Sequence, residues 1–349
     1  MAISTEILQA TLKNYLESHI PSKKHIRIDS LVKITDGWET DVYSFRSEYE
    51  SNRKHFFNDM ILRMYPGDES EGKATKEFNA IAQLLKAGYP VPKVYYLETN
   101  RSILGKPFMI MEKINGQSLG VVLEKKLETR ETLFRLFCKM FVNLHRLDLT
   151  PFITNRELFS DFSSYDVNDP FYYLNKLFAE WRSTVAMITD EYALDYFNKI
   201  MDWLDKNKQA VPYKKPSLVH LDYHPYNILI RNDGKPFVID WTNFNIADYR
   251  VDLAWTVLLM STYGNPTMRE QVLETYEKFA GSKVENIEYF EVIAATRRIG
   301  SIYLSLTQGA EKLGMLPETV ETMKRQTDHI NNIIKVINEI TGIAPKFEI

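Results

Sequence analysis

One segment, residues 218–240, constrains the fold of this chain more than any other. Within it, His220, Asp222 and Asn227 form the pattern H-x-D-x-x-x-x-N. Asp240 follows at the end of a short apolar run. Phosphoryl transfer from a nucleotide requires a carboxylate beside the attacking hydroxyl and oxygen ligands that hold magnesium on the phosphates. The chain is therefore expected to fold so that a strand-and-loop segment presents these side chains together.

Each polar residue of this segment suits a particular task. Asp222 is expected on a loop that leaves a strand, where its carboxylate can orient or deprotonate a hydroxyl. Asn227 and Asp240 offer side-chain oxygens, the ligands that magnesium prefers, and a buried carboxylate at a strand end needs a metal or another partner. We expect His220 to pack beneath the loop and support its backbone. His224 is a candidate contact for the acceptor.

Length and composition exclude several classes of protein. With 349 residues, 44% of them apolar, the chain can bury a large core and form two domains or lobes. A net charge of -3 gives no basic field for nucleic acid or an anionic membrane. Glu6 interrupts the apolar run that a signal peptide needs, and no uncharged apolar stretch approaches the ~20 residues that span a bilayer. With Cys138 as the single cysteine, no intrachain disulfide can form, and we expect a cytoplasmic protein.

Hydrophobic spacing divides the chain into two parts. In the first part we expect helices at 6–17 and 72–87 and strands at 31–34, 42–46, 57–64, 94–97 and 108–112. In the second part we expect helices at 132–145, 170–188, 192–206, 252–260, 268–279, 287–306 and 317–340. The segment 232–234, Asn-Asp-Gly, is expected to be a hairpin turn.

This pattern predicts an α+β protein of two lobes. Residues 1–114 would form the smaller, nucleotide-binding lobe, an antiparallel sheet with a leading helix and one further helix. Residues 115–349 would form a larger, mainly helical lobe with the catalytic loop, the metal site and the acceptor pocket. Active sites favour the clefts between such domains.

Further candidates lie outside the central segment. Gly37 lies in a turn between two predicted strands, where backbone N–H groups can contact phosphate oxygens. Arg63 on the third strand can reach the phosphates, and Glu77 on the next helix can pair with it. Asp252 directly precedes an apolar run, so we expect it to cap a helix N-terminus and to brace the catalytic loop.

The motifs together resemble those of the aminoglycoside phosphotransferase and choline kinase-like family, which has the protein-kinase-like fold. LVHLDYHPYNILI resembles its catalytic loop, FVIDW its metal-binding strand end, and DYRVDLAW its D-x-x-x-D-L-A element. FVNLHRLD and FMIMEKINGQSL are similar to its L-H-x-L-D helix end and its inter-lobe hinge, so the similarity runs over most of the chain.

The resemblance implies roles for individual residues. Asp222 would be the catalytic aspartate, and Asn227 and Asp240 would hold Mg²⁺. Arg63 would replace the phosphate-anchoring lysine, and the hinge backbone from Glu112 to Ile114 would receive the adenine of ATP, with GTP left open. Two departures stand out: arginine and lysine differ in geometry, and Asp41 in the glycine loop brings a negative charge near the phosphates.

The spacing after Asp240 favours a small-molecule hydroxyl as acceptor. Only residues 241–251 separate Asp240 from Asp252, which leaves no room for the activation segment along which protein substrates dock. Aromatic and acidic residues in 150–216, with Trp241 and Tyr303, could line a pocket for an amine or amino sugar.

Several alternatives stay open at this point. Arg297 and Arg298 would instead favour an anionic acceptor. A nucleotide-binding pseudokinase or regulatory module without turnover is the main functional alternative, and transfer of a nucleotidyl group is another.

Overall fold

The structure is a computed structural model that describes residues 4–20, 24–34, 40–51, 54–125, 127–155, 158–159, 166, 169, 171–212, 214–313, 315–317 and 319–347. Gly37 lies outside the described residues. The chain forms two compact units. The N-terminal unit comprises Met1–Gly116, Leu229–Thr242 and Gly314–Leu316, and the helical unit comprises Gln117–Ile228, Asn243–Leu313 and Pro317–Ile349. Residues 229–242, which include Asp240, therefore belong to the same unit as the N-terminal residues, which a single boundary at residue 114 does not describe.

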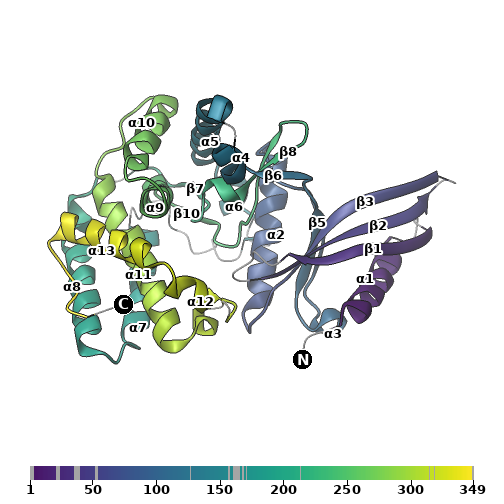
Figure 1. Ribbon diagram of the computed structural model, residues 1–349, viewed down its shortest axis with the longest axis horizontal. Coiled ribbons are helices and arrows are strands. Elements are labelled where there is room, and N and C mark those ends of the chain that lie inside the picture. The colour runs from purple at the N-terminus through teal and green to yellow at the C-terminus, as the bar shows by residue number, and fades with distance from the viewer. Residues whose placement is uncertain are drawn as a thin grey trace. The chain divides into compact units, whose positions relative to one another are not determined.

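A five-stranded antiparallel sheet in the order β1–β2–β3–β5–β4 forms the base of the N-terminal unit (Figure 1). Its strands are β1 (Lys24–Ile34), β2 (Asp41–Ser51), β3 (Lys54–Met64), β4 (Val94–Glu98) and β5 (Phe108–Glu112). The first three are longer than their apolar patterns indicate, because polar side chains continue the ladder; Arg46 and Asp59 pair across it at 2.7 Å.

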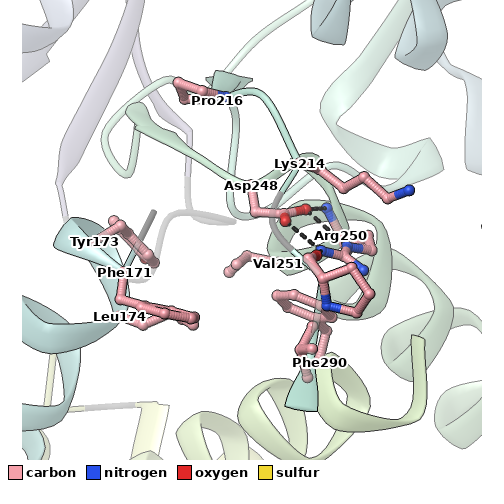
Figure 2. Close-up of a pocket in the computed structure, with 11 residues that line it drawn as sticks. Phe171, Tyr173, Leu174, Lys214, Pro216, Asp248, Arg250, Val251 and Phe290 are labelled. Atoms are coloured by element: carbon pink, nitrogen blue, oxygen red, sulfur yellow. Dashed lines mark hydrogen bonds and ion pairs between the residues drawn. The ribbon is translucent and has the colours of Figure 1, made fainter. Parts of the chain in front are cut away.

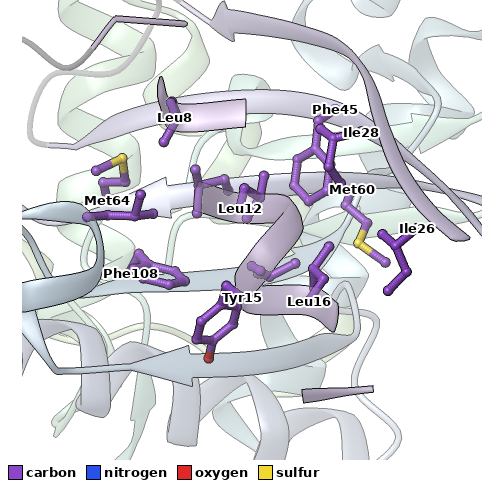
Figure 3. Packing of buried hydrophobic residues seen from close by; sticks show 13 residues of the cluster. Leu8, Leu12, Tyr15, Leu16, Ile26, Ile28, Phe45, Met60, Met64 and Phe108 are labelled. Atoms are coloured by element: carbon purple, nitrogen blue, oxygen red, sulfur yellow. The ribbon is translucent and has the colours of Figure 1, made fainter. Parts of the chain in front are cut away.

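Helix α1 (Thr5–His19) covers one face of this sheet. Ser4 caps its N-terminus by accepting a hydrogen bond from the Ile7 N–H. Leu8, Leu12 and Leu16 recur every four residues, so they form one apolar stripe. Figure 3 shows this stripe packed against buried side chains of the strands, among them Ile26, Ile28, Phe45, Met60 and Phe108.

Helix α2 (Ser70–Lys86), which contacts β4 and β5, carries Glu77 toward the interior of the same unit. The short helix α3 (Arg101–Leu104) lies between β4 and β5 in the chain. A second sheet has the order β6–β8–β9, with β6 (Gly116–Ser118), β8 (Ile228–Arg231) and β9 (Pro236–Val238). The expected turn joins β8 to β9, with Gly234 at a φ of 84° and its N–H donating to the Arg231 carbonyl at 2.8 Å.

The helical unit consists of α4 (Leu119–Lys125), α5 (Arg130–His145), α6 (Thr150–Ile153), α7 (Tyr172–Val185), α8 (Glu191–Asn207), α9 (Tyr249–Tyr263), α10 (Met268–Ala280), α11 (Ile287–Gln308), α12 (Thr319–Lys324) and α13 (Thr327–Thr341). Helices α9 and α11 pack together and are buried around most of their circumference, as expected for central helices. Two short strands, β7 (Ser217–Val219) and β10 (Asn245–Ala247), pair antiparallel; β7 leads into the loop of Asp222 and β10 leads into α9.

The helices agree with the expected ranges except at the C-terminus. The single helix expected over 317–340 is wrong, because α12 ends at Lys324 and α13 begins at Thr327. At this break the Gln326 side chain accepts a hydrogen bond from the Tyr263 hydroxyl at 2.7 Å, a tertiary contact that apolar spacing does not show. In the part of the chain that the structure describes, no helix combines the length and apolarity needed to cross a membrane.

The β6–β8 pairing requires glycine at position 116. A Cβ atom there would lie 2.0 Å from the Ile230 carbonyl oxygen, a backbone atom. We expect Gly116→Ala to lower the free energy of unfolding by about 1–3 kcal/mol, measured by urea denaturation. Gly72→Ala in the first turn of α2 is the control, because its Cβ would meet no atom within 4 Å. Equal stability of Gly116→Ala and the wild type would contradict this close approach.

Candidate functional site

The loop after β7 is held in a strained conformation by Asp252. Leu221 has a φ of 62°, in the left-handed region that costs a non-glycine residue about 1–2 kcal/mol. The buried Asp252 accepts a hydrogen bond from the His220 N–H at 2.7 Å and from the Leu221 N–H at 2.8 Å. The expected bracing contact is therefore present. The expected helix cap is wrong, because Asp248 caps α9 and Asp252 lies in its first turn.

The carboxylate of Asp222 is bound on both oxygens. Its Oδ1 accepts from the Trp255 indole N–H at 3.0 Å, and its Oδ2 accepts from the Asn227 amide at 3.1 Å. His224 Nε2 lies 3.5 Å from Oδ2, and the Asp222 N–H donates to His220 Nδ1 at 3.2 Å. His220 therefore supports the loop backbone, as expected.

These contacts set the charge of Asp222. Burial alone would raise the pKa of its carboxyl group. The hydrogen bonds from His224 and Trp255 and the positive potential of His224 and His220 outweigh burial and lower this pKa below its ordinary value. Asp222 is therefore ionised at neutral pH and can accept a hydrogen bond from a hydroxyl.

Asn227 is oriented so that its amide oxygen points away from Asp222. Its Nδ2 donates to both the carbonyl (2.9 Å) and the carboxylate (3.1 Å) of Asp222, which leaves Oδ1 as the atom offered to a ligand. Within the described ranges, no group of three or more His, Cys, Asp or Glu side chains converges as a metal cage. An amide oxygen is a ligand that suits Mg²⁺, which takes few protein ligands and keeps phosphate and water oxygens.

In the N-terminal unit, Arg63 joins two carboxylates. Its Nη1 lies 3.3 Å from Glu77 Oε1, and its Nη2 lies 2.6 Å from Asp240 Oδ1 and 2.7 Å from Thr242 Oγ1. Glu77 is fully buried and also accepts from the Tyr65 hydroxyl at 2.8 Å. The expected pairing of Arg63 with Glu77 is present. The hydrogen bonds of Tyr65 and Thr242 to this cluster could not be predicted from the sequence.

The charges of this cluster depend on one another. Burial and the Asp240 charge raise the pKa of Glu77, although Arg63 acts against them. Burial would lower the pKa of Arg63, but Asp240 and Glu77 raise it above its ordinary value, so Arg63 stays charged. Its Nε, also buried, has no hydrogen-bond partner among the described residues. Asp240 adopts a φ of 67°, and its side chain is 40% exposed.

In the predicted hinge, residues 112–114, the backbone N–H groups of Glu112 and Ile114 differ in their hydrogen bonding. The Glu112 N–H donates to the Lys93 carbonyl at 2.8 Å, so it is not available to a base. The Ile114 N–H has no acceptor in the described part of the chain.

Asp41 forms ion pairs with Lys33 at 2.8 Å and with Lys106 at 2.7 Å. These two cations neutralise its negative charge, which was expected to lie near the phosphates.

Two candidate acceptor contacts are wrong. Trp241 is fully buried, and its indole N–H donates to the Val238 carbonyl at 3.1 Å. Tyr303 is buried on α11, with ring centroids of Phe197 and Phe347 5.8 and 5.5 Å from its own. Both are core residues. His224, whose side chain is 24% exposed, stays a candidate.

A pocket of the helical unit lies apart from the loop residues. Its lining includes Phe171, Leu174, Asp248, Arg250 and Phe290 (Figure 2). The Arg250 guanidinium lies 2.6 Å from Asp248 and over the Phe290 ring at 4.4 Å. Neither Asp222 nor Asn227 lines this pocket, and its charged pair is satisfied internally, so we assign it to packing.

The buried cluster predicts a large loss of stability in Glu77→Ala. Removing this carboxylate leaves Arg63 without one of its two acidic partners, and breaking a buried ion pair costs about 3–5 kcal/mol in free energy of unfolding. Chemical denaturation checks this value. Glu71→Ala on the exposed side of α2 is the control, with an expected loss below about 1 kcal/mol. Similar losses in the two variants would contradict the assignment.

Comparison with known proteins agrees with this architecture. Residues 30–286 match the model of the phosphotransferase enzyme family, APH. A thermostable mutant of aminoglycoside phosphotransferase APH(4)-Ia is similar in structure, with a TM-score of 0.61 and 15% identity over 95% of this chain and 99% of that chain. Plasmodium vivax ethanolamine kinase gives a TM-score of 0.60 and 13% identity over 97% and 89% of the two chains. These similarities confirm the predicted fold class.

Two curated relatives carry names that describe another reaction. A probable acyl-CoA dehydrogenase of Arabidopsis thaliana is 25% identical over 211 residues, 57% of this chain and 24% of that protein. Acyl-CoA dehydrogenase family member 10 of Mus musculus is 23% identical over 265 residues, 74% of this chain and 22% of that protein. The chain thus spans about a quarter of the length of these relatives. Because the family model covers residues 30–286, the chain belongs to the phosphotransferase enzyme family.

Proposed function

We propose that this protein transfers the γ-phosphoryl group of ATP, with magnesium, to a hydroxyl group of a small molecule. The observation that carries the proposal is the geometry around Asp222, a carboxylate kept ionised on a braced loop. Family membership supports it. A further solved structure of similar fold, with a TM-score of 0.57, is a ternary complex of APH(4)-Ia with ADP and hygromycin B.

Asp222 would receive the acceptor. Its carboxylate accepts a hydrogen bond from the acceptor hydroxyl and turns the oxygen lone pair toward the γ-phosphorus. The acceptor oxygen then bonds to phosphorus while the bond from phosphorus to the β–γ bridging oxygen breaks, and the nucleoside diphosphate leaves. The hydroxyl proton passes to Asp222 as the new ester forms.

Asn227 and Asp240 would hold magnesium, each through a side-chain oxygen. When bound, magnesium neutralises charge on the phosphates. Arg63 binds Oδ1 of Asp240 and thereby fixes the direction of that carboxylate. The Arg63 charge also lies where the family resemblance implies the phosphate anchor.

The hinge favours adenine over guanine. The Ile114 N–H is a donor, and with the Glu112 N–H already bonded, Glu112 contributes its carbonyl, an acceptor. Adenine presents an amino donor beside a ring-nitrogen acceptor and matches this pair, whereas guanine presents a carbonyl beside an N–H. We therefore propose ATP as the phosphoryl donor.

The segment after Asp240 supports a small acceptor. Trp241 is buried, residues Asn245–Ala247 pair with β7, and α9 begins at Tyr249. Little chain is left between them for a docking surface for polypeptides.

A nucleotide-binding module without turnover is the second candidate. Its support is the 2.6 Å contact between Arg63 and Asp240, because this arginine competes with a metal for the carboxylate. A panel of amino alcohols, aminoglycosides and sugars, assayed by coupled ADP release with magnesium and ATP, separates the two. Nucleotide binding without turnover across the panel would favour the module.

Asp222→Ala tests the central role. We expect turnover to fall by about 10²–10⁴-fold, because the group that orients and deprotonates the hydroxyl is lost, with little change in nucleotide affinity. Coupled ADP release and calorimetric titration with ATP measure the two quantities. Asp233→Ala, in the exposed β8–β9 turn, is the matched control. Near-normal turnover of Asp222→Ala would exclude this function.

Asp240→Ala tests the metal role. We expect magnesium–nucleotide binding to weaken by about 10-fold or more, which corresponds to a loss of about 1.4 kcal/mol. Titration of magnesium at fixed ATP, after treatment with EDTA, shows the shift as a higher magnesium requirement. Asp240→Asn, which keeps one oxygen ligand, should lie between the wild type and alanine. The same magnesium requirement in all three proteins would remove Asp240 from the metal site.

A further inference from the structure

The backbone of Leu221, the residue before Asp222, is hydrogen-bonded at both its N–H and its carbonyl group. Asp252 on α9 accepts from the Leu221 N–H at 2.8 Å, and Arg297 on α11 donates from Nη1 to the Leu221 carbonyl at 2.9 Å. Because Leu221 has a left-handed φ of 62°, it keeps this conformation only where its surroundings hold it. Arg297 thus acts on the backbone that places Asp222.

Trp255 acts on the side chain of Asp222. Its indole N–H donates to Oδ1 at 3.0 Å, and its ring lies 4.2 Å from the Arg297 guanidinium carbon. Trp255 is 7% exposed and lies three residues after Asp252 on α9, so both side chains leave the helix on the same side. The backbone contact and the carboxylate contact are therefore parts of one packed arrangement.

The partners of Arg297 are unusual for an arginine. In the described ranges, no carboxylate oxygen forms an ion pair with it, and its contacts are a carbonyl and an aromatic face. A cation stacked on an indole is favourable by about 0.5–2 kcal/mol, and its planar shape suits stacking in a way that lysine does not.

The bound oxygens leave a defined place for the acceptor. A carboxylate can accept about four hydrogen bonds, two on each oxygen. Asn227 and His224 contact Oδ2, and Trp255 takes one position on Oδ1. Among the described residues Oδ1 thus has one partner, Trp255, and can accept a second hydrogen bond, such as one from a hydroxyl.

We propose that Trp255 and Arg297 are positioning residues for phosphoryl transfer: Arg297 fixes the Leu221 peptide, and Trp255 fixes the rotamer of the Asp222 carboxylate. This inference rests on the proposed function, since it takes Asp222 as the group that orients the acceptor. Neither residue belongs to the H-x-D-x-x-x-x-N pattern, and each comes from a different helix.

The first test needs no turnover. The full-length protein is labelled with ¹⁵N-tryptophan, and the Trp255 indole resonance is assigned by its loss in Trp255→Phe. We expect this resonance to shift in Asp222→Asn, which weakens the hydrogen bond, and in Arg297→Met, which removes the stacked cation. Trp203→Phe and Arg269→Met are controls, because Trp203 stacks on Tyr289 and Arg269 pairs with Glu291. If the chemical shift of the Trp255 indole resonance is the same in Asp222→Asn and the wild type, the proposal is wrong.

The second test separates positioning from binding. Turnover is followed as hydrolysis of magnesium–ATP to ADP and phosphate, with water as acceptor. We expect Trp255→Phe and Arg297→Met to lower kcat by about 10- to 100-fold with KM for ATP within about twofold, the pattern of misplaced reacting groups. Arg297→Lys, which can still donate to the Leu221 carbonyl, should recover part of the loss.

The outcomes distinguish this inference from the proposed function. If Asp222→Ala is inactive while Trp255→Phe and Arg297→Met keep the wild-type kcat, the inference is wrong and the function stands. If Asp222→Ala keeps wild-type turnover, the proposed function is wrong, and the inference that rests on it is wrong as well. A rise in KM with unchanged kcat would make Arg297 and Trp255 binding residues and would also overturn the inference.

Discussion

The loop that carries Asp222 depends on one buried carboxylate. Asp252 accepts hydrogen bonds from two successive backbone N–H groups, those of His220 and Leu221, and so holds the chain in a conformation that it would not adopt alone. A carboxyl group buried without hydrogen-bond partners would be costly, so the two N–H groups and Asp252 stabilise one another. The direction of Asp222, and with it the orientation of Asn227, follows from this support.

The sequence predicted much of this arrangement, and the successes and failures have physical causes. Most helices with regular apolar spacing were predicted within a few residues, whereas β1 and β2 extend well beyond the predicted strands and the helix expected over 317–340 is divided. The pairing of Arg63 with Glu77 followed from their places on neighbouring elements. Trp241 and Tyr303 failed because an aromatic side chain suits a core as well as a binding site, and only burial separates the two. Spacing cannot show that Arg297, far along the chain, reaches the Leu221 carbonyl.

A second polar cluster, around Arg63 and Glu77, holds a charged carboxylate in the interior of the N-terminal unit. Glu77 is fully buried, and its charge is tolerated because Arg63, Tyr65 and Thr242 all contact it. A buried pair of this kind contributes little net stability, since desolvation offsets attraction, but it fixes geometry when both partners are present. In the N-terminal unit that geometry includes Asp240, which keeps a half-exposed carboxylate despite a left-handed backbone.

The forked contact of Arg63 has an evolutionary consequence. Its two terminal nitrogens reach Glu77 and Asp240 at the same time, whereas a lysine has a single nitrogen and cannot span both in the same way. An Arg63→Lys substitution would therefore leave Glu77 or Asp240 without its cationic partner. We expect it to be accepted only together with changes at Thr242 or Tyr65 that compensate for this loss. The identity of position 63 and its neighbours should thus vary as a set among descendants of this sequence, a case of epistasis imposed by side-chain shape.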